Sequence, residues 1–129
     1  MGDRNTVMPG TIVWRDLTVG DAETVRDFYT QVIGWDTRPE EMDGYEDYHM
    51  IAPGSDETVA GICHARGINA DLPPQWLVYV IVEDVDASAN RCRELGGDIV
   101  TGPREMGTGR FCVIRDPAGA VLALYAPGE

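Results

Sequence analysis

The sequence predicts an α+β protein in which two βαβββ modules follow each other along the chain. Strand-like and helix-like patterns occur in the order strand, helix, strand, strand, strand in each half. One shift of 63 positions superimposes the two halves, which two unrelated halves would not be expected to allow. The shift brings together these pairs: Trp14 with Leu77, Asp21 with Asp84, Gly34 with Gly97, Tyr48 with Phe111, Ile51 with Ile114, and Ala60 with Ala123.

The first module begins with a run of β-branched and aromatic residues at 11–19, which predicts a strand. Asp21 follows as a helix N-cap, because its carboxylate can accept hydrogen bonds from the free amides of the first turn. An apolar stripe at spacings of three and four continues the helix to about Ile33, and Gly34 ends it. The remaining elements are a strand that begins at 35–38, an acidic loop at 39–44, and strands at 45–51 and 58–65.

The second module begins with the most apolar run of the chain, a predicted strand at 75–82. Asp84 caps a helix over 85–95, and Gly96 and Gly97 end it. The remaining elements are a short strand at 98–101, a turn at 102–103, and strands at 111–114 and 121–125 around a Pro- and Gly-containing turn at 116–119.

The modules and their flanking segments divide the chain into four parts that form one structural domain. A chain of 129 residues has the size of a single domain. The predicted parts are a flexible N-terminal arm at 1–9, the first module at 10–66, a linker at 67–74 and the second module at 75–129. The linker is predicted from its small and polar residues and its adjacent prolines.

Composition argues against several classes of partner. The chain carries 22 acidic and 10 basic side chains, a net charge of −12, so it is not expected to bind nucleic acid or an anionic membrane. No apolar run is long enough to span a bilayer, and no apolar signal segment opens the sequence. Three cysteines without a Cys-x-x-Cys pair are typical of a reducing compartment, so we expect a cytoplasmic protein.

Several short motifs, in this order and at this repeat spacing, resemble the vicinal oxygen chelate superfamily. That superfamily includes glyoxalase I, bleomycin-resistance proteins and extradiol dioxygenases. The resemblance implies curved, mixed four-stranded sheets that enclose a cleft, with the helices on the outside. The motifs that carry it are Asp21 with residues 27–29, Gly34-Trp35, Trp76 with residues 82–86, residues 95–97, and residues 116–119.

The resemblance also implies where a metal would be held. Metal-dependent members place His, Glu or Gln on the inner face of the first and last strand of each module, because a divalent ion needs nitrogen or oxygen lone pairs. The matching positions here are Trp14, Ala60, Leu77 and Ala123, and none of these side chains can coordinate a metal. We therefore predict no cofactor, and a divalent metal bound through other residues is the alternative.

Strand alternation identifies the side chains that could face the cleft. Trp14, Asp16, Tyr79 and Tyr125 share the inward parity of the metal positions, and flat aromatic rings could stack on an organic ligand. The alternative for each ring is that it only fills the core. The candidate ligand-binding residues are Trp14, Asp16, Tyr79, Phe111 and Tyr125.

Two further side chains are candidates for acid–base catalysis. Asp16 could act from the first strand, or its carboxylate could be held by Arg15 or by backbone amides. His64 has the parity of Ala60 and could point inward at the cleft end, but a lone histidine is more often a hydrogen-bonded residue of the rim or surface, and that position is the favoured one. His49 is expected to face the opposite way.

The predicted function is a bleomycin-resistance-like protein that binds a small organic molecule, aromatic or cationic, between its sheets without a metal. Proteins of that branch are usually dimers, so the resemblance implies a homodimer. The alternative is a lyase, isomerase or dioxygenase of the same superfamily. Such an enzyme would use a divalent metal, or Asp16 or His64 as an acid–base residue.

Overall fold

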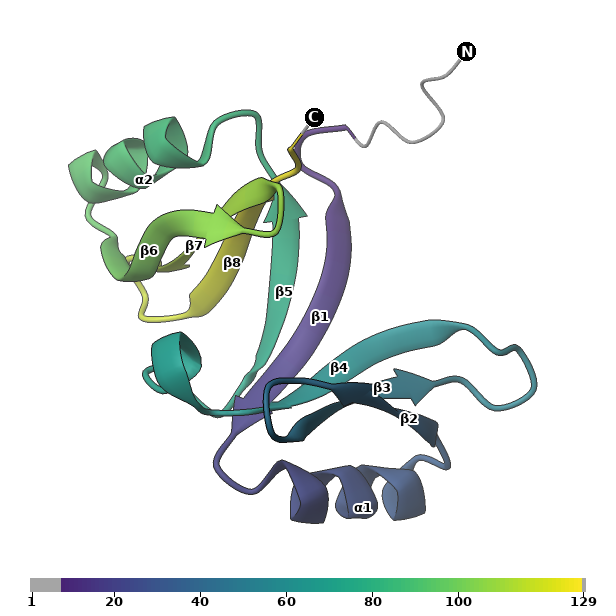
Figure 1. The fold of residues 1–129 in the computed structure, drawn as a ribbon. Coiled ribbons are helices and arrows are strands. Elements are labelled where there is room, and N and C mark those ends of the chain that lie inside the picture. The colour runs from purple at the N-terminus through teal and green to yellow at the C-terminus, as the bar shows by residue number, and fades with distance from the viewer. Residues whose placement is uncertain (1–7, 129) are drawn as a thin grey trace. The chain divides into compact units, whose positions relative to one another are not determined.

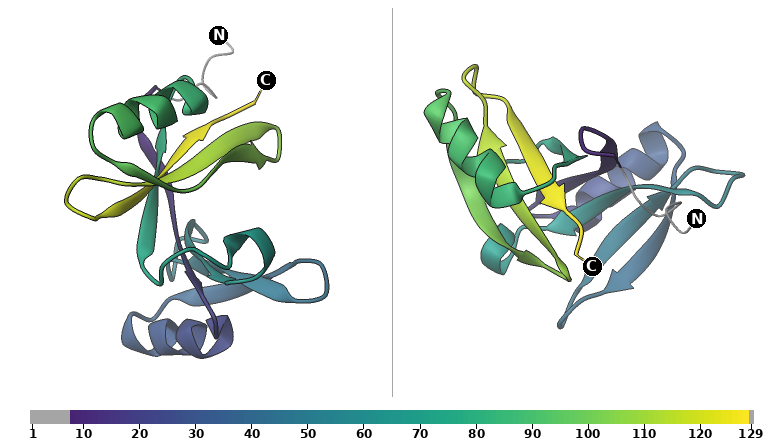
Figure 2. Two further views of the ribbon diagram at one scale, coloured as in Figure 1. Left: turned by 90° about the vertical axis from the view of Figure 1, so that its left-hand side faces the viewer. Right: turned by 90° about the horizontal axis from the view of Figure 1, so that it is seen from above.

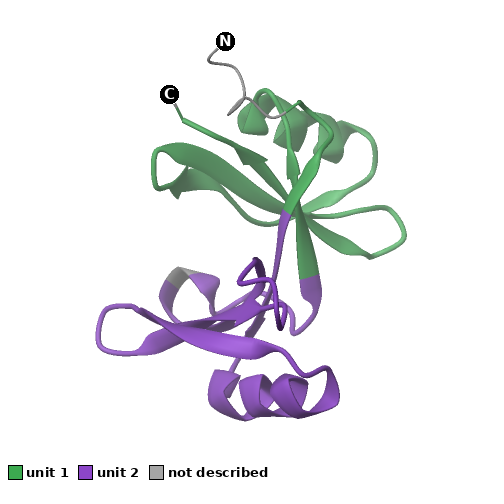
Figure 3. Ribbon diagram, turned by 90° about the vertical axis from the view of Figure 1, so that its right-hand side faces the viewer, with its two compact units in different colours: residues 1–13, 77–129 green, residues 14–76 purple. Residues whose placement is uncertain are grey.

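The computed structural model describes residues 8–128, apart from the side chain of residue 68, so most of the predicted N-terminal arm (residues 1–7) lies outside the described residues. Eight strands and two α-helices follow in the predicted βαβββ–βαβββ order (Figure 1). The predicted α+β class is confirmed. The chain divides into two compact units, which Figure 3 colours green (unit 1, residues 1–13 and 77–129) and purple (unit 2, residues 14–76).

Unit 2 is a mixed four-stranded sheet with one helix. Its strand order is β2-β3-β4-β1, in which β1 and β4 are parallel and the other neighbours antiparallel. Helix α1 packs on one sheet face through a core of Ala22, Tyr48, Met50, Ala60 and Ile62. The elements are β1 (Ile12–Val19, from residue 14 on), α1 (Ala22–Val32), β2 (Asp36–Glu41), β3 (Glu46–Ile51), β4 (Thr58–His64) and a 3₁₀ helix (Gly67–Asn69) in the predicted linker.

Unit 1 repeats this plan with the strand order β5-β8-β7-β6. Helix α2 packs on its sheet through Val85, Ala89 and Cys112, and each helix in Figure 2 lies along one face of its own sheet. Residues 8–13 also belong to this unit, and the Gly10 amide donates to the Ile81 carbonyl at 2.7 Å. The elements are β5 (Trp76–Ile81, from residue 77 on), α2 (Val85–Glu94), β6 (Asp98–Met106), β7 (Gly109–Arg115) and β8 (Val121–Ala126).

Both helices begin as the sequence predicts. The Asp21 carboxylate accepts from the Thr24 amide at 3.2 Å, and the Asp84 carboxylate accepts from the Ala87 amide at 3.1 Å. Because each carboxylate satisfies an amide that has no partner within its helix, the two caps fix where α1 and α2 start.

Two predicted loops are strand instead. Residues 39–41, assigned to an acidic loop, belong to β2, and β6 continues through the predicted turn at 102–103 as far as Met106. In both segments a Pro lies in the outermost strand of the sheet, where it removes no hydrogen bond from a central ladder. Irregular pairing of β6 with β7 between Ile99 and Arg104 accommodates the second of them.

The repeat keeps its offset of 63 in the helices but not in the closing hairpins. Tyr48 pairs with Ile62 on the α1 side, whereas the pair on the α2 side is Cys112 with Leu124. The structural offset is therefore 64 from β3 to β7 and 62 from β4 to β8, one residue away from 63 in each case, so residues 63 positions apart in these strands face opposite sides of their sheets.

This register corrects one predicted position. Ala60 packs under α1, so its side chain faces the helix and not the opposite sheet face. Gly61 is the β4 residue beside Asp16 in the parallel pair, as Ala123 is the β8 residue beside Tyr79. The counterpart of Ala123 is therefore Gly61.

Candidate functional site

The candidate site is a pocket of about 220 Å³ in unit 2, on the sheet face that points away from α1. Strands β1, β3 and β4 supply its floor, and the end of β2 supplies one side. The residues that line it are Trp14, Asp16, Glu40, Met42, Asp47, Tyr48, His49, Gly61 and Cys63.

Trp14 and Asp16 lie two residues apart on β1 and therefore face the same side. The indole Nε1 donates a hydrogen bond to Asp16 Oδ2 at 3.2 Å. The indole also meets the His49 ring edge-on, with centroids 6.3 Å apart and planes at 75°. These contacts hold an aromatic ring and a carboxylate side by side at the pocket.

His49 is held in place by two neighbouring side chains. Its Nδ1 lies 3.1 Å from Arg38 Nη2, and its Nε2 lies 3.3 Å from Glu40 Oε1. A guanidinium can only donate, so Nδ1 must accept and Nε2 must carry the proton that points to Glu40. Arg38 also donates to Thr58 Oγ1 at 3.2 Å, which anchors it on the neighbouring strand.

Cys63 is poorly suited to act as a nucleophile. Burial, reinforced by the nearby carboxylates of Asp16 and Asp47, raises the pKa of its thiol well above the ordinary value of 9.0. The thiolate is the reactive form of cysteine, so this side chain stays protonated and inert near neutral pH. Asp47 is also fixed, because its Oδ1 accepts from the His64 backbone amide at 2.9 Å.

The charge of the pocket has one sign. Asp16, Glu40 and Asp47 contribute carboxylates, and none of the described residues that line it is Arg or Lys. Trp14 and Met42 add apolar surface beside these charges. Such a lining suits a ligand that is part apolar and part cationic.

Two of the predicted ligand-binding aromatics lie elsewhere, in the interior of unit 1. Tyr79 and Phe111 stack with centroids 6.3 Å apart and planes at 14°, and only 6% and 1% of their surfaces are exposed. The Arg104 guanidinium covers the Phe111 ring at 4.3 Å. Tyr125, half-buried, pairs with Phe111 across β7 and β8. Of the five predicted residues, Trp14 and Asp16 line the unit 2 pocket.

The two histidines exchange their predicted faces. His64 lies on the α1 side, with its ring centroid 5.7 Å from that of Tyr45 and 6.2 Å from that of Tyr48. The inward placement of His64 was wrong because it relied on the parity of Ala60. His49, expected to face away, lines the pocket. The alternation of β3 could have found His49 and Asp47, but only with the hairpin register known.

The residues at the four positions that the family resemblance indicates do not fit a divalent metal as the metal-dependent members would hold it. Trp14, Gly61, Leu77 and Ala123 have no side-chain donor for such an ion. Within residues 8–128, no group of three or more His, Cys, Asp or Glu side chains is arranged to hold a metal.

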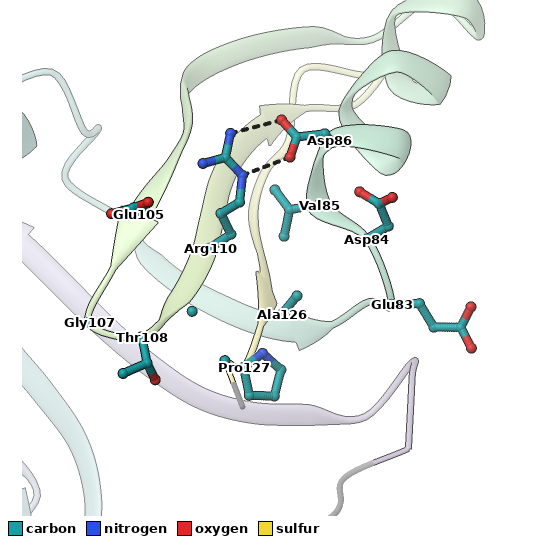
Figure 4. A pocket seen from close by; sticks show the side chains of 12 residues that line it. Glu83, Asp84, Val85, Asp86, Glu105, Gly107, Thr108, Arg110, Ala126 and Pro127 are labelled. Atoms are coloured by element: carbon teal, nitrogen blue, oxygen red, sulfur yellow. Dashed lines mark hydrogen bonds and ion pairs between the residues drawn. The ribbon is translucent and has the colours of Figure 1, made fainter.

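A larger hollow in unit 1, of about 600 Å³, has a different chemistry (Figure 4). Arg110 donates to both carboxylate oxygens of Asp86 at 2.7 and 2.9 Å, and so its charge is already paired. The rest of the wall is formed by carboxylates, the hairpin tip at 107–109 and the segment 126–128. Its lining includes no aromatic side chain, so it offers no surface on which a ring could stack.

Comparison with known proteins identifies the family to which the chain is similar. A family model described as the Glyoxalase/Bleomycin resistance protein/Dioxygenase superfamily matches residues 11–124. "Putative glyoxylase CFP32" of Mycobacterium tuberculosis is 32% identical over 127 residues, which cover 97% of this chain and 49% of that protein. "Anthracycline biosynthesis protein DnrV" of Streptomyces peucetius is 31% identical over 121 residues, covering 92% of this chain and 42% of that protein. The chain thus spans about half the length of the curated relatives it matches.

A solved structure supports the same fold. Methylmalonyl-CoA epimerase from Mycobacterium tuberculosis aligns with a TM-score of 0.54 and 21% identity, over 96% of this chain and 92% of that one. At this identity the likeness concerns the fold alone. No helix in the described part of the chain is long and apolar enough to cross a membrane.

Proposed function

Since the chain belongs to the glyoxalase/bleomycin resistance protein/dioxygenase superfamily, we propose that it binds a small, planar, cationic organic molecule without the help of a metal ion. The observation that carries this proposal is the unit 2 pocket, in which an indole lies beside carboxylates and the lining contains no Arg or Lys. A ring would stack on Trp14 while its positive charge faces Asp16.

Stacking on Trp14 and charge attraction to Asp16 both favour a cationic ring. An aromatic face attracts a cation by about 0.5–2 kcal/mol, depending on how far water is excluded. A carboxylate a few ångströms away adds Coulomb attraction, which is stronger in a partly buried pocket than in water. The relative named for anthracycline biosynthesis supports this class of ligand, because anthracyclines are flat polycyclic molecules.

Binding can be tested with a matched pair of probes, N-methylquinolinium and its neutral analogue 1-methylnaphthalene. We expect the wild-type protein to bind the cation at least about tenfold more tightly than the neutral ring, a difference of about 1.4 kcal/mol. Trp14→Ala should abolish this binding, measured by calorimetry or NMR titration, whereas Met106→Ala, at an exposed position in unit 1, should leave it intact. Equal affinity for the two probes would contradict the role of charge.

The proposed metal independence has its own test. Protein purified without chelators should contain well under one divalent ion per chain by elemental analysis, and EDTA should not change probe binding. One tightly bound nickel, zinc, manganese or iron ion per chain would overturn the metal-free proposal.

We also propose that the protein acts as a homodimer. The pocket is smaller than the roughly 300–1,000 Å³ of ordinary ligand sites, and the curated relatives are about twice as long as this chain. A second copy of the chain would supply further walls for the pocket. Light scattering coupled to size-exclusion chromatography should give twice the chain mass, and a monomer that still binds the probe would contradict this step.

A cytoplasmic location belongs to the same proposal, supported by three cysteines in the free thiol form. Cell fractionation with a redox-sensitive alkylation assay should recover all three in reduced form. Recovery from an oxidising compartment would contradict it.

The second candidate function is acid–base catalysis on the same ligand. Asp16 and His49 line one cavity, so a carboxylate and an imidazole would face the same bound molecule. Asp16→Asn would then abolish turnover while leaving binding of an uncharged analogue intact. If Asp16→Asn loses cation binding and the wild-type protein shows no detectable turnover, the binding function is favoured.

A further inference from the structure

We propose that Gly61 is the positioning residue of the unit 2 pocket, because its missing side chain lets the Trp14 indole lie across β4. The claim that Gly61 controls ligand fit rests on the proposed function. The claim that Gly61 positions the indole rests on geometry alone. Gly61 is buried in the centre of the sheet face that carries the pocket.

The space above Gly61 is already taken by the two β1 side chains. A Cβ at Gly61 would lie 3.3 Å from Asp16 Cβ and 3.4 Å from Trp14 Cζ2. The distance to Asp16 Cβ is tighter than most real Cβ contacts, so Asp16 would have to give by a few tenths of an ångström, whereas the distance to Trp14 Cζ2 lies at the border of ordinary contact. Asp16 Cβ is fixed to the backbone of β1, which also carries Trp14, so relieving this contact displaces the Asp16 carboxylate together with the indole that is hydrogen-bonded to it.

The other contacts of the indole give it one resting place. Nε1 is tied to Asp16 Oδ2 at 3.2 Å, and the His49 ring borders it with centroids 6.3 Å apart. His49 is in turn held by Arg38 and Glu40. An indole pushed away from β4 would stretch the Nε1 bond or press on His49, and either response changes the wall on which a ligand ring would stack.

The chain offers a matched control. The backbone φ of Gly61 lies outside the left-handed region, so alanine can adopt it without strain and the variant tests space alone. Gly20, at the end of β1 in the same unit, also has an ordinary φ, and a Cβ there would meet nothing within 4 Å. Gly61→Ala and Gly20→Ala thus add the same methyl group, one under the indole and one in open space.

The experiment follows the indole N–H signals of the three tryptophans by ¹H–¹⁵N NMR, with Trp14→Phe used to assign the Trp14 signal. We expect Gly61→Ala to shift the Trp14 signal and speed its hydrogen exchange, while the Trp35 and Trp76 signals stay in place. Gly20→Ala should shift none of the three. An unchanged Trp14 signal in a folded Gly61→Ala protein would overturn the inference, and so would equal shifts of all three signals.

Ligand fit is read in the same samples by titration with N-methylquinolinium. We expect Gly61→Ala to weaken its binding at least about fivefold relative to Gly20→Ala. A shifted Trp14 signal with unchanged affinity would overturn the claim that Gly61 controls ligand fit. If the wild-type protein does not bind the probe, the proposed function fails in this form, and the Trp14 signal alone still decides whether Gly61 positions the indole.

Discussion

In unit 1 the sheet face that points away from α2 carries Leu77, Tyr79, Phe111, Val113 and Ala123, and every one of these side chains is buried. In unit 2 the equivalent face carries Trp14, Asp16, His49 and Cys63, all of them partly exposed around a pocket. The strand order and the helix caps are the same in both units. The same βαβββ plan therefore yields a packed core in one copy and a candidate site in the other.

The difference lies in the chemistry of a few side chains. Where Phe111 stacks on Tyr79 and Arg104 covers the Phe111 ring, large side chains fill the face and leave little room for a ligand. Where Gly61 leaves space on β4, an indole and a carboxylate can share the surface. A module of this kind can thus change its role by substitutions on one sheet face while its helix side stays intact.

The largest effect is expected from Phe111→Ala. Removing a ring that is only 1% exposed leaves a cavity in unit 1, and we expect a loss of about 3–5 kcal/mol in the free energy of unfolding. Phe28→Ala, at a ring that is 56% exposed on α1, should cost about 0.5 kcal/mol or less. Urea denaturation measures both. Similar losses for the two variants would remove the distinction between a packed and an open face.

A smaller contrast is expected between neighbouring residues of β4. Ile62→Ala removes a fully buried side chain from the core under α1 and should cost about 2–5 kcal/mol. Cys63→Ala, on the opposite face at the pocket, should cost about 1 kcal/mol or less. Denaturant midpoints of the two single variants give the comparison. If Cys63→Ala proved the more damaging, the assignment of the two faces of β4 would be wrong.

The smallest effect is expected at the ion pair of unit 1. The hydrogen bonds from Arg110 hold the pKa of the Asp86 carboxyl below its ordinary value of 3.8. A lowered pKa in the folded state stabilises the fold above pH 3.8, and this contribution is lost as the pH falls through the folded pKa. Arg110→Gln should therefore return the Asp86 pKa towards 3.8 in an NMR titration, and the stability difference from wild type should shrink below that pH. An unchanged Asp86 pKa would show that the pair has no effect in solution. The pairing of an acidic with a basic residue is not repeated in unit 2, because the residues 63 positions before Asp86 and Arg110 are both acidic, Glu23 and Asp47.

Local patterns predicted the elements well, because their causes are local. The Asp21 and Asp84 caps, the apolar stripes of the helices and the turn at 116–119 depend on residues within a few positions of each other. The inward parity of Trp14 and Asp16 also held, because it needs only the alternation of one strand. The loops assigned at 39–44 and 102–103 failed because an outermost strand tolerates Pro.

The sequence by itself determined the βαβββ repeat, the helix caps and the absence of metal-binding side chains at the positions that the family resemblance indicates. Only the tertiary structure decided that Gly61 rather than Ala60 faces the pocket, that His49 rather than His64 lines it, and that Tyr79 and Phe111 are interior. The physical reason is that side chains alternate along a strand. A change of one residue in the spacing between strands leaves no strong local signal, yet it moves every residue of the displaced strand to the other face, and the pairing between distant strands is what fixes the result.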